Sequence, residues 1–295
     1  MANTTGGIFL AAIAEQTLDY LGREFYALSS FTRNFSTDIA QKGESVKTRV
    51  PSAITAGDLS GGYTAADVTS TAKTISLSNF KGPVYAFTDL EVSKAGDARW
   101  LERLFVKPAV EATVKAVMDD LLALVTNANF SASSTITAAN FDSDDLADLS
   151  ADLTTSKVPK SLRSALISET YNASLQKDAA IQDASSYGSP DAIREHSAGL
   201  VHGFGVVEYT AIPTNSENLA GFVCHPSALL IAARQVADPN NPLVKTLNTV
   251  EPVTGLPLQF RYWYDRNNGK YMVSIGLLYG VAVGNSAALK RILSA

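Results

Sequence analysis

Residues 41–77 read QKGESVKTRVPSAITAGDLSGGYTAADVTSTAKTISL, and no other segment constrains the architecture as strongly. Polar and apolar side chains alternate with period two over residues 41–50 and again over 71–77, which predicts two long β-strands. Between them, residues 51–64 are rich in turn-forming residues and poor in large apolar side chains. The pattern predicts a long hairpin whose tip has no core of its own.

Such a hairpin needs support from outside itself. A two-stranded ribbon alone is at best marginally stable in water. This ribbon carries charged side chains on one side and little apolar bulk on the other. We therefore expect it to lie on its own domain or on another subunit.

Helical periodicity appears on either side of the hairpin. Residues 8–21 carry apolar side chains at helical spacing, which predicts an amphipathic N-terminal helix. From Asp97, a second apolar stripe predicts a long helix that ends near residues 127–129 and is kinked or restarted at Pro108. The Asp119-Asp120 pair on this helix could suggest a metal site, but it is interpreted as a solvated face, because no His or further carboxylate follows at i+3 or i+4.

The rest of the chain mixes short strands with helices, so the fold class is α+β. The stretch Asp-Ser-Asp-Asp at 142–145 predicts an N-cap followed by a short acidic helix to Leu153, and the spacing of its carboxylates misses the calcium-loop pattern. The remaining predicted elements are strands at 165–168, 200–209 and 219–224, and helices at 173–180 and, after Pro226, 227–234.

The C-terminal end carries the clearest local signal. Residues 256–264 and 271–279 are alternating runs, and Asn267-Asn268-Gly269 lies between them. Asn-Gly between such runs predicts a β-hairpin.

The composition is that of a folded chain with a neutral surface. Of 295 residues, 46% are hydrophobic, which suffices for one large domain or two modest ones. Only 18% are charged, so neighbouring subunits can cover much of the surface at little desolvation cost. The net charge of −5 argues against a nucleic-acid reader but suits a container whose lining repels packaged DNA.

Few residues are candidates for catalysis or for metal binding. Cys224 is the one cysteine and is interpreted as a small buried hydrophobe, and His196, His202 and His225 lack the spacing of metal ligands. The motifs of serine hydrolases, metalloproteases and P-loops are absent, and the glycines of residues 199–205 are interpreted as a tight bend before a strand. We predict no catalytic, cofactor-binding or metal-binding residues and no enzymatic activity.

The beginning of the sequence does not have the pattern of a secretory signal. No basic residues precede the short apolar stretch 8–13, and no apolar run approaches the roughly 20 residues that a bilayer span needs. We expect a protein that is made in the cytoplasm, remains there and has no membrane partner.

The order of these predicted elements resembles that of the major capsid (coat) proteins of tailed bacteriophages, which have the Hong Kong 97-like fold. The order covers nearly the whole chain: a short N-terminal helix, a long hairpin, a long helix, a mixed α+β region and a final β-hairpin. Three segments match by pattern and not by a single diagnostic motif: Ser-Ala-Leu-Ile-Ser at 164–168, Gly-Leu-Val-His-Gly-Phe-Gly-Val at 199–206 and Gly-Phe-Val-Cys-His-Pro-Ser-Ala-Leu at 221–229.

The resemblance implies four structural parts. These are an N-terminal arm at 1–36, an extended loop at 37–88, a peripheral domain with a long spine helix at 89–139 and 250–295, and an axial domain at 140–249.

The resemblance also implies a function. The chain would assemble into hexamers and pentamers of an icosahedral phage head in the host cytoplasm, and would enclose double-stranded DNA in the virion without reading its sequence. Implied partners are other copies of the chain, a portal, a cement protein and a separate scaffolding protein. The arm is short and lacks coiled-coil heptads, which implies either that separate scaffold or cleavage before this form of the chain. Some relatives crosslink Lys to Asn; Lys42, Lys47 and Lys73 are candidates by position alone.

We expect Lys47, Arg49 and Asp58 of the loop at contacts between subunits. Three other functions stay open. An encapsulin-type nanocompartment shell would differ in particle size, DNA content and the lack of a tail. A small-molecule enzyme built on the glycine-rich turn 199–205 would be a monomer or dimer with a defined ligand. The third is a tail protein or another minor virion component.

Overall fold

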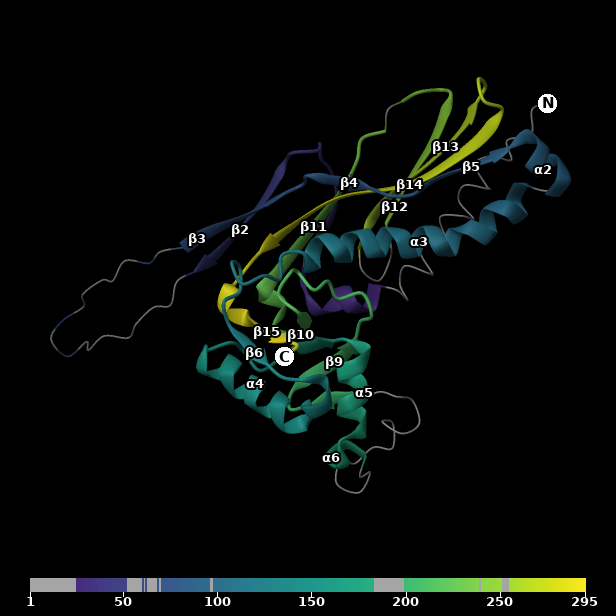
Figure 1. The fold of residues 1–295 in the computed structure, drawn as a ribbon. Helices are drawn as coiled ribbons and strands as arrows, with labels where there is room; N and C mark the ends of the chain where they lie inside the picture. Colours follow the sequence, from purple (N-terminus) through teal and green to yellow (C-terminus); the bar gives the residue numbers. More distant parts are fainter. Residues whose placement is uncertain are drawn as a thin grey trace.

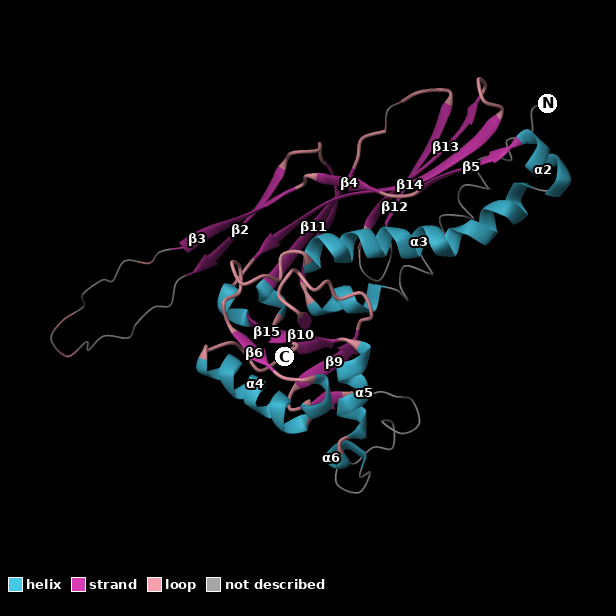
Figure 2. Ribbon diagram, in the orientation of Figure 1, coloured by secondary structure: helices cyan, strands magenta, loops and turns pink. Residues whose placement is uncertain are grey.

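The computed structural model describes residues 25–51, 60, 62, 68, 70–95, 98–182, 199–238, 240–250 and 255–295. Within these ranges, an elongated sheet with a long helix along one face lies over a second, smaller sheet that is flanked by shorter helices (Figures 1 and 2). A separate two-stranded hairpin projects from one end of the long sheet. The predicted N-terminal helix at 8–21, Asp58 and His196 lie outside the described residues.

The long sheet is built around one strand, β14 (Lys270–Val283). Residues 270–276 of β14 pair with β13 (Pro257–Asp265), and residues 278–283 pair with β11 (Leu229–Gln235). Residues 270–274 and 277–279 also pair with β5 (Val84–Thr88) and β4 (Asn79–Lys81). Because a strand has only two edges, β11 and β13 follow each other along one edge of β14, and β4 and β5 occupy the other.

Two further strands complete this seven-stranded sheet. β1 (Thr32–Ile39) pairs in parallel with β11, and β12 (Val244–Val250) pairs antiparallel with β13. The predicted C-terminal hairpin is confirmed, since Asp265 pairs with Lys270 and Gly269 has a φ of 58° in the turn.

A long helix covers one face of this sheet. α3 (Ala98–Leu122) continues through Pro108 and ends at Leu122, earlier than predicted, and α2 (Asp89–Ala95) precedes it. Val273, Ile275, Leu277 and Tyr279 alternate along β14 and are buried, and the Tyr279 hydroxyl lies 3.2 Å from the Ala116 carbonyl oxygen of α3. The odd-numbered side chains of β14 therefore face α3.

The smaller sheet has six strands and forms the lower body in Figure 1. In spatial order they are β6 (Ser133–Thr135), β15 (Leu289–Leu293), β10 (Leu219–Cys224), β7 (Arg163–Ile167), β9 (Phe204–Glu208) and β8 (Leu200–Val201). The accompanying helices are α4 (Ser143–Thr155), α5 (Glu169–Lys177), α6 (Ala179–Gln182) and the short 3₁₀ helices η1 (Phe25–Ser30), η2 (Ala138–Asn140), η3 (Pro226–Ala228) and η4 (Ser286–Ala288).

The predicted start of α4 is confirmed at the level of single hydrogen bonds. Asp142 is the N-cap, and its carboxylate accepts the backbone N–H groups of Asp144 and Asp145. The Asp145 carboxylate in turn accepts the backbone N–H of Asp142 at 3.2 Å, which completes a capping box. These local hydrogen bonds mark where the helix begins, and the carboxylate of Asp178 adds a further cap by accepting the Ser143 N–H at 3.0 Å.

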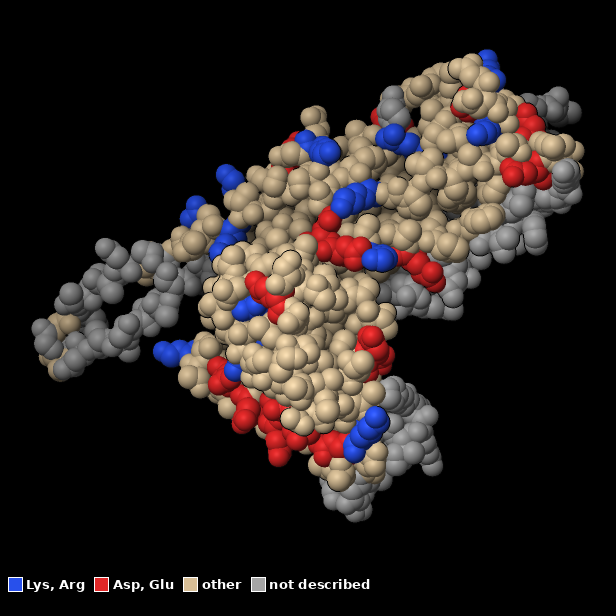
Figure 3. Space-filling view, viewed as in Figure 1, with Lys and Arg blue, Asp and Glu red and all other residues tan. Residues whose placement is uncertain are grey.

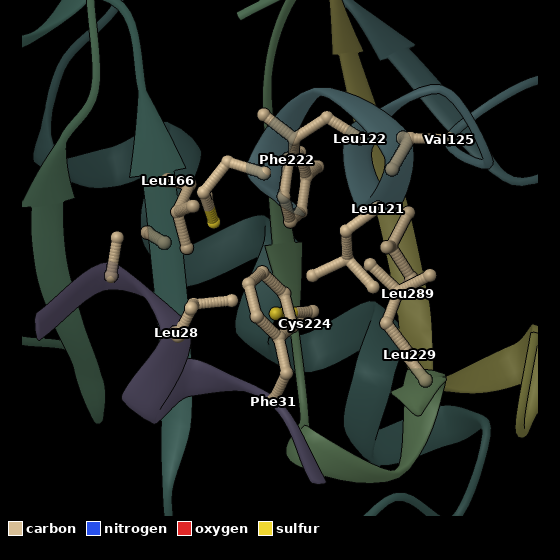
Figure 4. Close-up of a cluster of buried hydrophobic side chains, with 14 of the residues drawn as sticks. Leu28, Phe31, Leu121, Leu122, Val125, Leu166, Phe222, Cys224, Leu229 and Leu289 are labelled. Carbon is tan, nitrogen blue, oxygen red and sulfur yellow. The ribbon is translucent and has the colours of Figure 1, made fainter. Parts of the chain in front are cut away.

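One continuous core joins the two layers. Figure 4 shows Leu28 and Phe31 from the N-terminal side, Leu121 from α3, and Phe222 and Cys224 from β10 in a single cluster. The rings of Phe31 and Phe222 are stacked with centroids 6.4 Å apart. Cys224 is fully buried, as predicted.

The predicted helix at 227–234 is wrong. After the short η3, residues 229–235 form β11, which lies between β1 and β14. Residues 229–233 are all buried, so both faces of the strand are covered. A short, continuous apolar run fits either a buried helix or a buried strand, and in this case β-pairing determined the outcome.

Each of the two sheets draws strands from both sides of residue 250. β15 lies in the six-stranded sheet, whereas β11 and β12 lie in the long sheet with β13 and β14. The sequence patterns predicted neither β12 nor β15. The chain passes between the layers at η3 and η4, where the Gly284 N–H donates to the Ala228 carbonyl and the His225 N–H donates to the Ala288 carbonyl.

Glycine at 280 allows the hairpin base to lie against β14. A Cβ atom at this position would be 2.1 Å from the carbonyl oxygen of Ser76, a backbone atom that cannot rotate away. We predict that Gly280→Ala destabilises the subunit by about 1–3 kcal/mol, measured by denaturant unfolding.

Gly205→Ala is the matched control, because the nearest atom to its Cβ would be the Arg163 carbonyl oxygen at 3.9 Å. Equal stability of the Gly280 variant and the wild type would contradict the close crossing.

Candidate functional site

The predicted hairpin is present and is the most exposed feature of the fold. β2 (Ser45–Pro51) pairs antiparallel with β3 (Ser70–Ser76), with Lys47 opposite Thr74 and Arg49 opposite Ala72. Figure 1 shows both strands directed away from the rest of the chain.

Only the base of the hairpin has a core. A small apolar cluster there is separate from the main core and joins residues next to the hairpin to β11 and β14. Its members are Ala40, Ile75, Leu77, Leu230, Ala232 and Leu278. The Ala40 N–H donates to the Gln235 carbonyl at 2.9 Å, and the Leu77 N–H donates to the Glu44 carbonyl at 2.7 Å. The hairpin is therefore fixed where it leaves the body.

Beyond this base the ribbon has little to bury. Lys47, Thr48 and Arg49 are exposed on β2, and the residues opposite them on β3 are exposed or half-buried. The Arg49 guanidinium donates one long hydrogen bond, 3.4 Å, to the Ser70 hydroxyl. Alternation along β2 places Lys47 and Arg49 on the same face of the ribbon. Their role in subunit contacts remains a prediction, as does that of Asp58.

The charges of the described surface are unevenly distributed. Figure 3 shows basic side chains over the hairpin and its base and a row of acidic side chains along α4. The acidic row includes Asp144, Asp148 and Asp152, all of which are exposed. Two distant parts of one chain thus present opposite charge.

Asp120 anchors the strand that leaves the hairpin. Its carboxylate accepts hydrogen bonds from Lys81 Nζ at 2.7 Å, Asn79 Nδ2 at 2.9 Å and the Tyr279 hydroxyl at 2.6 Å. The interaction ties β4 and β14 to α3. Burial, followed by the hydrogen bond to Asp120, raises the pKa of Tyr279 far above its ordinary value, so Tyr279 acts as a neutral donor.

The interpretation of Asp119-Asp120 as a solvated face is wrong for Asp120, whose side chain is only 25% exposed. It fits Asp119, which is more exposed and pairs with Lys115 one helical turn away at 2.8 Å. The partners of Asp120 lie 39, 41 and 159 residues away in the sequence, so helical spacing carried no sign of them.

Two buried arginines fix the six-stranded sheet. Arg291 of β15 donates to the Phe130 carbonyl at 2.7 Å and pairs with Glu217. Arg163 of β7 donates to backbone carbonyls at the end of α4, including that of Val158 at 2.7 Å, and burial lowers its pKa. Both connect a sheet strand to neighbouring loops, and sequence reasoning did not identify either of them.

The glycine-rich segment 199–205 forms the tight hairpin between β8 and β9. His202 and Gly203 both have positive φ, 46° and 86°, at its turn. The His225 ring contacts the Ser227 hydroxyl at 2.9 Å. In the part of the chain that the structure describes, no group of three or more His, Cys, Asp or Glu side chains is arranged to hold a metal ion, and no helix is long and apolar enough to cross a membrane.

Sequence comparison alone does not assign this chain to a family, since no protein-family model and no curated protein matches it. Solved structures do match. A chain from Mycobacterium phage Che8 is 17% identical with a TM-score of 0.56, and the match covers 91% of this chain and 87% of that one. A chain of the cyanophage P-SCSP1u capsid is 13% identical with a TM-score of 0.61, covering 90% and 86%.

The mature capsid of bacteriophage PhiM1 gives a TM-score of 0.60 at 11% identity, covering 90% of this chain and 86% of that chain. This chain has a phage capsid fold. The α+β, Hong Kong 97-like architecture expected from the order of elements is thereby confirmed, although the identities lie far below what sequence comparison detects.

Removing the charge of Asp120 should weaken the attachment of β4 and β14 to α3. Hydrogen bonds to a charged, half-buried group are worth about 1.5–3 kcal/mol, so we predict that Asp120→Asn lowers the free energy of unfolding by about that amount. Denaturant unfolding measures the loss, and limited proteolysis at residues 70–88 measures release of the strands.

Asp119→Asn is the neighbouring control and should cost at most about 0.5 kcal/mol, because an exposed ion pair contributes little. Equal effects of the two variants would contradict the anchor.

Proposed function

We propose that this chain is the major capsid protein of a tailed bacteriophage, which assembles into hexamers and pentamers of an icosahedral head around double-stranded DNA. The observation that carries the proposal is a hairpin fixed at its base and exposed on both faces beyond it, on a chain with a phage capsid fold. A ribbon of this kind is stabilised only when another surface covers it.

The neighbouring copies supply that surface. The basic hairpin and the acidic row on α4 give each copy two regions of opposite charge, which favour contacts between different surfaces of neighbouring copies. Many weak contacts of this kind act together, so a closed shell is stable although each single contact stays reversible. Lys47 and Arg49 supply such contacts in this proposal, together with Asp58.

The parts of the capsid fold take revised boundaries in this proposal. The long sheet with α3 is the peripheral part, and the six-stranded sheet with α4 and α5 is the axial part. The segment 199–205 serves the β8–β9 turn, and the chain acts by binding and not by catalysis. A portal, a cement protein and a separate scaffolding protein are its further partners, and the virion is its location.

Electron microscopy of the purified protein, alone and from infected cells, tests the function. We expect closed icosahedral particles, with DNA and a tail in the particles from infected cells. Small particles that hold enzymes and no DNA would identify an encapsulin-type shell, and a monomer that never assembles would contradict both.

Charge reversal on the hairpin tests its role. We predict that Lys47→Glu with Arg49→Glu abolishes normal particles while the unassembled subunit keeps its melting temperature, because both side chains are exposed and make few contacts in the subunit. Lys157→Glu with Lys160→Glu changes the net charge equally on the exposed turn after α4 and is the control. Normal heads from the hairpin variant would count against the hairpin's role.

A further inference from the structure

A cavity of about 450 Å³ lies where the base of the hairpin meets the body of the same subunit. Its walls come from β2 and β3 of the hairpin, from β1 and β11 of the long sheet, and from the segments next to η3 and η4 where the chain passes between the layers. The volume falls within the roughly 300–1,000 Å³ that is typical of small-molecule sites. We call it the hairpin cavity.

The hairpin contributes one wall of the hairpin cavity. Val46 and Ile75 are opposite each other in the β2–β3 ladder, and Thr48 follows Val46 on the same face because side chains alternate along a strand. Ile75 is only 3% exposed and packs with Leu230 of β11 in the small apolar cluster at the base. This face of the ribbon is therefore directed toward β11, and Lys47 lies on the opposite face.

The body contributes the second wall. Leu230 and Ile231 of β11 line the cavity from the long sheet, and both are buried. Val46, on the hairpin side, is only half-buried. An apolar molecule between the two walls removes their remaining apolar surface from water, which is favourable. The occupant therefore needs an apolar body.

The charge of the lining is positive. Arg33 is exposed and is the one charged residue among the described residues that line the cavity, and no Asp or Glu is among them. The Nδ1 of His225, another lining residue, accepts the Ser227 N–H at 3.2 Å. Burial, followed by the charge of Arg163, lowers the pKa of His225, so the ring is neutral and carries its proton on Nε2. A guanidinium and an imidazole N–H both favour an acceptor, and a carboxylate suits the guanidinium best.

We propose that the hairpin cavity binds a small amphipathic anion, a monocarboxylate with an apolar chain or ring. Its carboxylate pairs with Arg33, and its apolar body contacts Val46 of the hairpin and Leu230 of the sheet. Because the two walls belong to different parts of the fold, the ligand binds only while the base of the hairpin keeps its position and, by linkage, stabilises that position. The inference goes beyond the proposed shell function and does not depend on it, because all of these groups belong to one subunit.

A direct titration tests the ligand class. Decanoate is the probe, and decan-1-ol, an uncharged molecule with the same number of carbons, is its matched control. Calorimetry on the unassembled subunit, below the concentration at which decanoate forms micelles, should give saturable binding of one decanoate per subunit and about tenfold or more weaker binding of decan-1-ol. Absence of saturable decanoate binding, or equal affinity for the two molecules, overturns the proposal.

Two substitutions on the hairpin test the location. Thr48→Trp places a large side chain in the cavity and should weaken decanoate binding by about tenfold or more, whereas Thr74→Trp lies on the opposite face of the ribbon and should leave it unchanged. Both threonines are exposed, so both variants should keep the melting temperature of the wild type. Equal decanoate binding by the two variants overturns the assignment to this cavity.

Arg33→Gln tests the carboxylate contact without filling the cavity, and it does so even if Thr48→Trp fails to fold. The affinity for decanoate should fall to that for decan-1-ol, and the affinity for decan-1-ol should not change, because the apolar walls stay intact. A preference for decanoate that survives the substitution overturns the role of Arg33.

Hydrogen exchange tests the effect on the hairpin. Saturating decanoate should slow amide exchange at residues 45–50 and 70–76 in the wild type, because the base must release the ligand before it opens, and should not slow it in Thr48→Trp. Unchanged exchange with decanoate bound overturns the linkage between ligand and hairpin. All of these measurements use unassembled subunits, so their failure is distinct from a failure of the shell function, which electron microscopy tests.

Discussion

The carboxylate of Asp120 connects three segments that are far apart in the sequence, and the hairpin depends on this connection. Asn79 and Lys81 lie on the strand that leaves the hairpin, Tyr279 lies at the centre of the longest strand, and Asp120 itself lies near the end of α3. Together with the small apolar cluster at the base, it fixes the direction in which an otherwise unsupported ribbon leaves the body. Beyond that base, the described part of the ribbon buries little against its own chain.

The described part of the molecule therefore consists of a well-packed body and a hairpin with little core of its own. The main core is continuous through both layers, and buried arginines such as Arg291 fix the loops around the smaller sheet. In contrast, the described hairpin side chains beyond the base are exposed or half-buried. In the proposed shell, contacts with other copies cover these exposed side chains.

Backbone features near in sequence could be predicted with good accuracy. The capping box at Asp142, the Asn-Gly turn at 267–269 and the period-two alternation of β2 and β3 each arise from interactions within a few residues. The order of these elements was enough to predict a fold that pairwise identities of 11–17% do not reveal. Errors occurred where several elements compete for one apolar segment, as at 229–233, which became a central strand and not a helix.

The sequence by itself determined the hairpins, the long helix, the α+β class and the shortage of large apolar residues between the two hairpin strands, because alternation, capping and turn chemistry act locally. Only the tertiary structure decided the role of Asp120, the crossing of β14 at Gly280 and the burial of Arg163 and Arg291. Each of these depends on which distant strands and helices meet, and therefore on burial and register across the whole sheet. Side chains of the same type, such as Asp119 and Asp120, differ in environment although they are adjacent in the sequence.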